Sequence, residues 1–101
     1  MPRKMINPHP GEILMEEFLK PLGLSQNRLA IEVRVPCHRI NELVHARRGI
    51  TADTALRLAR FVGTSPDFWM NLQKSYDLAA AGESLESELL RIHCLSSERA
   101  A

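Results

Sequence analysis

The apolar residues between Ser25 and His45 constrain the fold of this chain more than any other feature. Their spacing lets two short helices joined by a tight turn bury one shared face. That face consists of Leu29, Ala30, Val35, Ile40 and Leu43. Two helices can cross closely only where a side chain is small, and Ala30 stands at that point. The pattern therefore predicts a helix-turn-helix over roughly residues 25–45.

Local signals indicate where these two helices begin and end. Ser25 is a favourable N-cap, and apolar residues stand before and after it in the positions of a hydrophobic staple. The first helix should therefore run to about Glu32 and be followed by the turn Val-Arg-Val. Proline suits the first turn of a helix, so the second helix is expected from Pro36 to Val44.

The turn carries one residue that departs from the usual chemistry. Arg34 occupies a position at which a helix-turn-helix commonly has glycine, because the backbone there often needs a positive φ. A non-glycine residue in that conformation stores about 1–2 kcal/mol of strain. A right-handed turn is the alternative, and the flanking Val33 and Val35 favour it. Because Pro36 restricts the residue before it and leaves the turn few ways to cross the helices, we predict a positive φ at Arg34.

Four further helical segments are predicted outside this motif. One spans roughly residues 10–20, one spans residues 52–62, one starts at Pro66 after the cap Ser65, and one follows Gly82 and frays toward the chain end. The side chains expected to face the core are Leu14, Phe18, Leu22, Ala55, Leu56, Ala59, Val62, Leu85, Leu89 and Ile92. No segment alternates as a strand does, and 45% hydrophobic residues suffice for one core. We therefore expect an all-α, compact bundle of five to six helices, with residues 1–82 as the helix-turn-helix domain and residues 83–101 as a C-terminal helix and tail.

The formal net charge of +1 hides an uneven distribution of charge along the chain. Residues 25–60 hold seven basic and three acidic side chains, whereas residues 61–101 hold three basic and six acidic ones. A basic segment attracts polyanions, and an acidic segment attracts basic proteins. The distribution therefore indicates two partners, with nucleic acid bound at the helix-turn-helix.

The polar side of the second helix has the chemistry to recognise base pairs. Turning about 100° per residue from Ile40 gives the composition of that side. It holds His38, Glu42 and His45, with Arg39 and Asn41 at its two edges. Arginine pairs favourably with guanine and asparagine with adenine. Arg47 and Arg48 follow the helix without an apolar role, so we expect them to contact phosphates. The alternative is that all these side chains are merely solvated, and the charge distribution argues against it.

The chain resembles the HigA-type antitoxins, within the Cro/C1-like helix-turn-helix proteins, in three segments: PGEIL at 10–14, LAIEVRVPCHRINELV at 29–44 and RRGITADTALRLARFVGTSPDFWMNLQKSYDL at 47–78. The resemblance implies a lambda-repressor-like fold and an antitoxin of a bacterial toxin–antitoxin pair. Such an antitoxin neutralises a small ribosome-dependent mRNA endonuclease and represses its own operon as a dimer, without a cofactor. By position, the resemblance puts operator contacts on Ser25, Gln26, His38, Arg39 and Asn41.

Together, these arguments give one set of candidate DNA-contacting residues. They are Ser25, Gln26, Pro36, Cys37, His38, Arg39, Asn41, Glu42, His45, Arg47 and Arg48. Two other functions remain open at this point. One is a free-standing repressor without a toxin, and the other is a protein-interaction module that does not bind DNA.

Two acidic surfaces are candidates for binding a toxin, because basic partners are drawn to acidic patches. The first consists of Glu12, Glu16 and Glu17 on the first helix, for which a merely solvated face is the alternative. The second consists of Asp77, Glu83, Glu86 and Glu88. A ridge of Trp69, Leu72 and Tyr76 is expected to be core, with a dimer interface as the alternative.

Other chemistry finds little support in the sequence. Neighbouring residues on a helix point about 100° apart, so Cys37–His38 and His93–Cys94 are poorly arranged for zinc, and we expect no metal. No nucleophile elbow, phosphate-binding glycine loop or pair of carboxylates indicates an enzyme, and His9 is expected to be a cap or turn residue. The sequence begins without the apolar stretch of a signal peptide. We therefore expect a cytoplasmic, nucleoid-associated protein with no membrane contact and both cysteines as free thiols.

Overall fold

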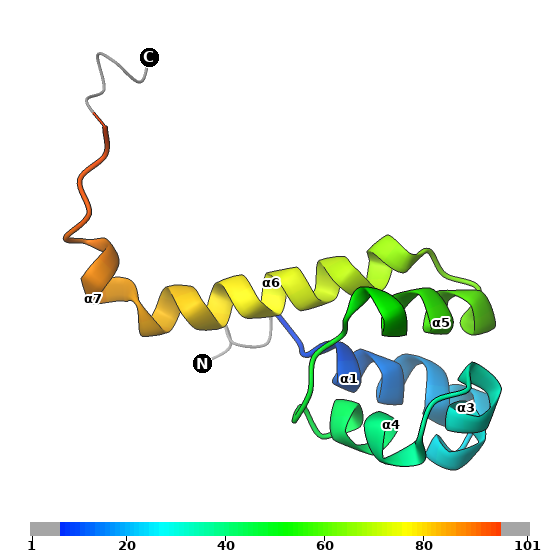
Figure 1. The fold of residues 1–101 in the computed structure, drawn as a ribbon. Coiled ribbons are helices and arrows are strands. Elements are labelled where there is room, and N and C mark those ends of the chain that lie inside the picture. The colour runs from blue at the N-terminus through cyan, green and yellow to red at the C-terminus, as the bar shows by residue number, and fades with distance from the viewer. Residues whose placement is uncertain (1–6, 96–101) are drawn as a thin grey trace.

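The computed structural model describes residues 7–95, which form helices and loops (Figure 1). The elements are α1 (Pro10–Ile13), η2 (Leu14–Leu19), α2 (Lys20–Leu22), α3 (Gln26–Val33), α4 (Cys37–Val44), α5 (Ala52–Val62), α6 (Pro66–Ser84) and α7 (Glu86–Leu89). α1, η2 and α2 follow one another without a break, and α7 is a single turn. No strand occurs within residues 7–95. The expected all-helical fold of five to six helices is therefore confirmed.

The first helix continues through Pro21 rather than ending before it. Its middle part, η2, is wound as a π-helix, so the N–H of Lys20 donates to the carbonyl of Met15, five residues earlier. A proline has no N–H to donate, and the wider π turn keeps its ring away from the carbonyl four residues before it. The helix ends instead at Gly23, whose φ is 61°. The expected end at Lys20 is thus wrong.

The π turn also changes which side chains of this helix are buried. A wider turn moves the repeat of the buried face from four residues to five. Leu14 and Leu19 are accordingly buried, and Phe18 is half-buried. Leu22 is 64% exposed, so its expected burial is wrong.

The helix-turn-helix itself forms as predicted. Ser25 caps α3, and its Oγ accepts a hydrogen bond from the N–H of Arg28 at 3.0 Å. Arg34 ends α3 in the left-handed region, with φ 65° and ψ 46°, which confirms the prediction of a positive φ. α4 begins at Cys37 because Pro36 is extended, with ψ 144°, and is the N-cap rather than part of the first turn.

α5 has the expected ends but a different buried face. Thr51 caps it, and Gly63, with φ 85°, ends it. Leu56 is 58% exposed, whereas Leu58 is completely buried. Leu56 lies about 100° around the helix from the buried Ala55 and points away from the core. The expectation that Leu56 is buried is therefore wrong.

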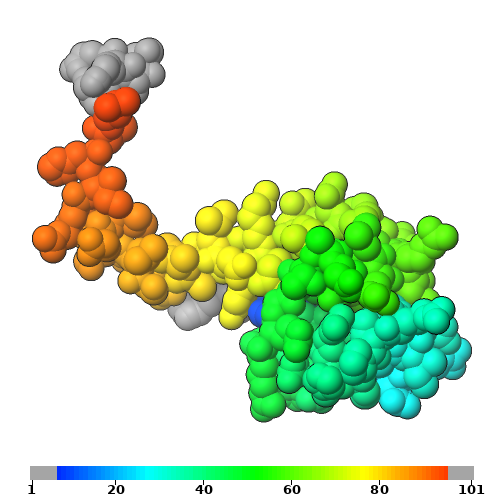
Figure 2. Space-filling model, in the orientation of Figure 1, coloured from blue at the N-terminus to red at the C-terminus, as the bar shows by residue number. Residues whose placement is uncertain are grey.

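α6 is long, and only its first half packs against the other helices. It begins at the cap Ser65, passes through Gly82 and leaves Leu78 66% exposed. Its second half and α7 project from the lobe as an arm (Figure 2). The radius of gyration is accordingly 17.2 Å, against about 13 Å for a compact domain of this size. The helix expected after Gly82 is reduced to α7, where Leu85 and Leu89 are exposed, and Ile92 beyond it is exposed too. The tail expected after residue 95 lies outside the described residues.

The core lies where the first helix, α3, α4, α5 and the first half of α6 meet. Trp69 is completely buried, and its Nε1 donates to the Thr64 hydroxyl at 2.8 Å. Among the described residues, the other large side chains that are completely buried are Pro10, Leu14, Leu29, Ile40, Leu43 and Leu58. Within residues 7–95, no helix combines the length and the apolar character needed to cross a membrane.

Candidate nucleic-acid interface

α4 presents the polar face that its sequence predicts. Ile40 and Leu43 are completely buried on its inner side. The outward side chains are His38, Asn41 and His45, which are exposed, and Arg39 and Glu42, which are half-buried. The assignment of these five side chains to the outward face is therefore confirmed.

One edge of this face is tied to the beginning of α3. The side-chain amide of Asn41 donates to Oε1 of Gln26 at 3.1 Å. Gln26 is the first residue of α3, and the exposed cap Ser25 precedes it. The bond occupies one of the two N–H groups of Asn41, so a donor and the amide oxygen remain for an adenine edge. The geometry thus brings Ser25, Gln26 and Asn41 together at one edge.

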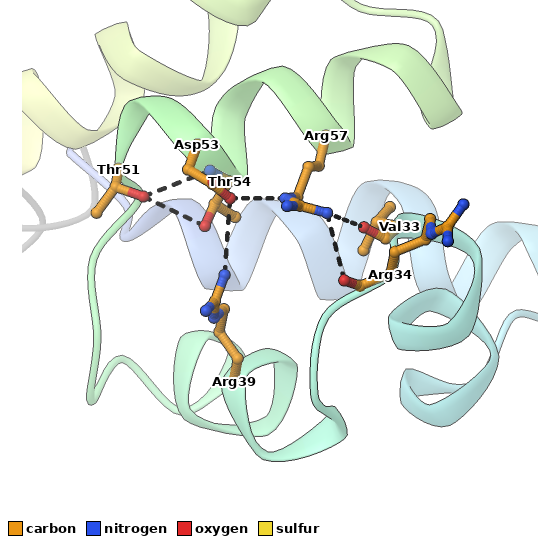
Figure 3. Close-up of polar contacts among 7 residues, drawn as sticks. All are labelled: Val33, Arg34, Arg39, Thr51, Asp53, Thr54 and Arg57. Atoms are coloured by element: carbon orange, nitrogen blue, oxygen red, sulfur yellow. Dashed lines mark hydrogen bonds and ion pairs between the residues drawn. The ribbon is translucent and has the colours of Figure 1, made fainter.

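The other edge of the face is tied to the beginning of α5 (Figure 3). Asp53, in the first turn of α5, accepts a hydrogen bond at 2.6 Å from Nε of Arg57 one turn later. The same carboxylate oxygen lies 3.7 Å from Nη1 of Arg39 on α4. Nη1 of Arg57 donates to the carbonyls of Val33 at 2.9 Å and Arg34 at 3.3 Å, which end α3. Arg57 and Asp53 therefore connect the turn of the motif to Arg39, a connection that sequence reasoning missed.

The loop after α4 carries the two expected phosphate-binding arginines in different states. Arg48 binds Oε1 of Glu42 through Nη2 at 2.8 Å and Nε at 2.9 Å. Arg47 is exposed, and no ion pair within the described residues involves it. Ala46 has a φ of 59°, which the sequence did not indicate because alanine has no preference for that conformation. The glutamate that stands on the outward face of α4 thus holds one of the two cations.

A glutamine from α6 anchors this loop to the core. Oε1 of Gln73 accepts a hydrogen bond from the N–H of Ile50 at 2.6 Å. A Cβ on Gly49 would lie only 2.9 Å from that oxygen, so a larger residue there would displace the Gln73 side chain. Nε2 of Gln73 in turn donates to Asp77 at 2.9 Å. The contact joins residues 23 positions apart, which is why no local sequence signal revealed it.

His9 stands at the beginning of the first helix and contacts α6. Nδ1 of His9 accepts a hydrogen bond from the N–H of Gly11 at 2.9 Å, which confirms its expected role as a cap. Its ring lies edge-on to Tyr76, with centroids 4.8 Å apart. Burial lowers the pKa of His9, and the carboxylates of Asp77 and Glu12 only partly oppose this effect. His9 thus links the first helix to α6.

Gly11 permits a close approach between the first helix and α4. A Cβ built on it would lie 1.8 Å from the carbonyl oxygen of Leu43 and 2.6 Å from the carbonyl carbon. Both atoms belong to the backbone of α4, so no side-chain rearrangement can make room. The position of α4 therefore depends on Gly11, a residue that the sequence did not single out.

The remaining candidates have simpler surroundings. Pro36 is the N-cap of α4, and Cys37 is its exposed first residue. Cys37 and Cys94 are both free thiols, as expected. Within residues 7–95, no three side chains of histidine, cysteine, aspartate or glutamate gather where they could hold a metal ion.

The candidate protein-binding residues differ in how much surface they offer. Glu12, Glu16 and Glu17 are all exposed, and Glu16 pairs with Lys20 at 2.9 Å. The acidic residues of the second surface are exposed as well. Trp69 is completely buried in the core, so it offers no surface to a second copy, whereas Leu72 and Tyr76 are half-buried.

Comparison with known proteins places this interface in context. No model of a known protein family matches the sequence. "Virulence-associated protein I" of Dichelobacter nodosus is 54% identical over 79 residues, which are 78% of this chain and 73% of that protein. The Pseudomonas aeruginosa antitoxin HigA, solved with the higBA promoter, has a TM-score of 0.86 at 42% identity and covers 89% of this chain and 99% of its own. The antitoxin GraA in complex with its operator has a TM-score of 0.84 at 40% identity and covers 89% and 92%.

Proposed function

This chain belongs to the HigA family of antitoxins, and we propose that it binds the operator of its own operon and neutralises a small mRNA-endonuclease toxin encoded beside it. The observation that carries the DNA-binding part is the outward face of α4, whose two edges are held by α3 and α5. The proposed function consists of binding DNA and a toxin, and it requires no catalytic residue.

A dimer would place two copies of α4 in successive major grooves of double-stranded DNA. Half-sites about 34 Å apart, one helical turn, are then expected on the operator. The half-buried Leu72 and Tyr76 are the candidates for the dimer interface. A protein with this function resides in the cytoplasm and associates with the nucleoid.

Binding to the promoter fragment upstream of the chain's own gene tests the DNA-binding part. We expect Asn41→Ala to weaken binding to this fragment by about 1–3 kcal/mol and binding to a scrambled duplex much less, because a base contact is lost. Asn71→Ala is the matched control, since Asn71 is an exposed residue of α6 away from α4. Equal losses on both duplexes for Asn41→Ala would show that α4 does not read bases, and a single short footprint would contradict the symmetric dimer.

The acidic surface of the first helix is the proposed toxin-binding surface. Glu12, Glu16 and Glu17 support this assignment because their side chains are exposed and lie on a helix other than α4. Co-purification with the product of the neighbouring gene tests it. Replacing the three glutamates by glutamine should abolish co-purification while DNA binding is retained.

Two results would contradict this assignment. Loss of the complex on replacing Glu83, Glu86 and Glu88 by glutamine, with the first helix unchanged, would move the toxin to the arm of α6 and α7. Absence of any co-purifying neighbour would favour a free-standing repressor.

A further inference from the structure

We propose that Asp53 determines how well this protein distinguishes its operator from other DNA, by holding Arg39 at the edge of the α4 face. The inference rests on the proposed DNA-binding function and adds to it a residue that lies outside the helix-turn-helix. It starts from the connection in Figure 3, in which one carboxylate faces two guanidinium groups.

The two contacts of Asp53 differ in strength. Its bond to Arg57 is short, at 2.6 Å, and Arg57 is itself fixed by the carbonyls that end α3. The contact with Arg39 is long, at 3.7 Å, which is an ion pair but not a hydrogen bond. Arg57 therefore positions the carboxylate of Asp53, whose side chain is 58% exposed, while Arg39 is oriented by charge and remains able to move toward a base.

This arrangement affects cognate and other DNA differently. Binding to arbitrary DNA depends on the number of cations that neutralise phosphates, whatever their orientation. Asp53 offsets the charge of one cation at the interface, so it opposes this kind of binding. Reading guanine requires the planar fork of arginine in one orientation, which the carboxylate favours. Asp53 thus lowers affinity for wrong sequences and preserves it for the right one.

The experiment compares Asp53→Asn with the wild type on the promoter duplex and on a scrambled duplex of equal length and composition. Unmasking one cation should steepen the salt dependence of scrambled-duplex binding by up to about 1 per protomer and raise that affinity by up to about eightfold at 0.1 M salt. On the promoter duplex, the lost orientation of Arg39 should offset this gain. The preference for the promoter should therefore fall several-fold.

Asp67→Asn is the matched control. Asp67 occupies the same position in the first turn of α6 that Asp53 occupies in α5, and no ion pair within the described residues involves it. It carries the same change of charge, so it should alter both affinities slightly and equally and leave the preference unchanged. Melting temperatures of both variants show whether each remains folded.

A double substitution separates orientation from general charge. If Asp53 acts through Arg39, then Asp53→Asn introduced into an Arg39→Gln background should no longer change the preference. The role of Asp53 would be overturned if the preference for the promoter survived Asp53→Asn in the wild-type background. It would also be overturned if Asp53→Asn lowered the preference equally in the Arg39→Gln background, and neither result would affect the proposed function. Equal wild-type affinity for the two duplexes would instead overturn the proposed function and this role with it.

Discussion

Replacing Arg34 by glycine should stabilise the protein, although it removes a whole side chain. No hydrogen bond that ends α3 at this point uses the side chain of Arg34. The N–H of Arg34 donates to Ile31 at 3.2 Å, the N–H of Val35 donates to Ala30 at 3.0 Å, and the carbonyl of Arg34 accepts from Arg57. Glycine keeps all of these bonds, and the arginine side chain is exposed. The substitution therefore changes mainly the backbone conformational energy.

The magnitude follows from two opposing effects at this residue. A φ of 65° costs a residue with a Cβ about 1–2 kcal/mol, which glycine does not pay. Glycine also gives the unfolded chain more freedom, which lowers stability by about 0.4–1 kcal/mol. With each effect taken near the middle of its range, the net gain in the free energy of unfolding is about 0.5–1 kcal/mol. For a domain of this size, that gain raises the melting temperature by about 2–8 °C.

Thermal melts followed by circular dichroism, in matched buffer without DNA, measure this difference. Gly63→Ala is the mirror control, because Gly63 ends α5 with φ 85° and a Cβ there would meet nothing within 4 Å. It should lower the melting temperature by a similar amount. A lower midpoint for Arg34→Gly, with the expected loss for Gly63→Ala, would refute the strain at Arg34.

Three further outcomes are expected. Gly11→Ala should lower the free energy of unfolding, measured by chemical denaturation, by about 1–3 kcal/mol or more, because its methyl group would meet the backbone of α4. Gly82→Ala is the control and should raise the free energy of unfolding, because a Cβ there meets nothing within 4 Å. Alanine at both Arg47 and Arg48 should weaken promoter and scrambled duplexes alike and flatten the salt slope by up to about 2 per protomer; an unchanged slope would remove both from the interface. Because burial lowers the pKa of His9, the unfolded chain takes up a proton first, so stability should fall as the pH decreases below about 6.5. His9→Asn keeps a cap acceptor without titrating, and urea melts at several pH values should show a smaller decrease for it.

The ends of most helices were predictable because short-range bonds define them. Ser25, Thr51 and Ser65 each cap a helix through an N–H three residues later, so the signal and its effect lie within one turn. Gly63 ends α5 for an equally local reason. The backbone of the motif could therefore be read from the sequence.

The failures have several other causes. The π turn in the first helix changes the period of the buried face, and a search for the ordinary helical repeat cannot detect it. The end of α6 was misplaced because Gly82 carries little weight in an exposed helix that follows three alanines, where helix propensity outweighs the roughly 1 kcal/mol cost of glycine. Leu56 is apolar, which predicts burial, but its side chain points away from the core and is 58% exposed.

The partners of the residues proposed to read bases were not predictable, and this limits what α4 alone determines. Gln26 holds Asn41 and Asp53 faces Arg39, and both partners lie in the first turns of neighbouring helices. Their positions are fixed by how α3, α4 and α5 pack, not by the sequence of α4. Two chains with the same α4 but different residues at positions 26 and 53 would therefore present the same side chains in different orientations. Operator preference should accordingly depend on all three helices, and transplanting α4 into a relative should not transfer it unless those two residues go with it.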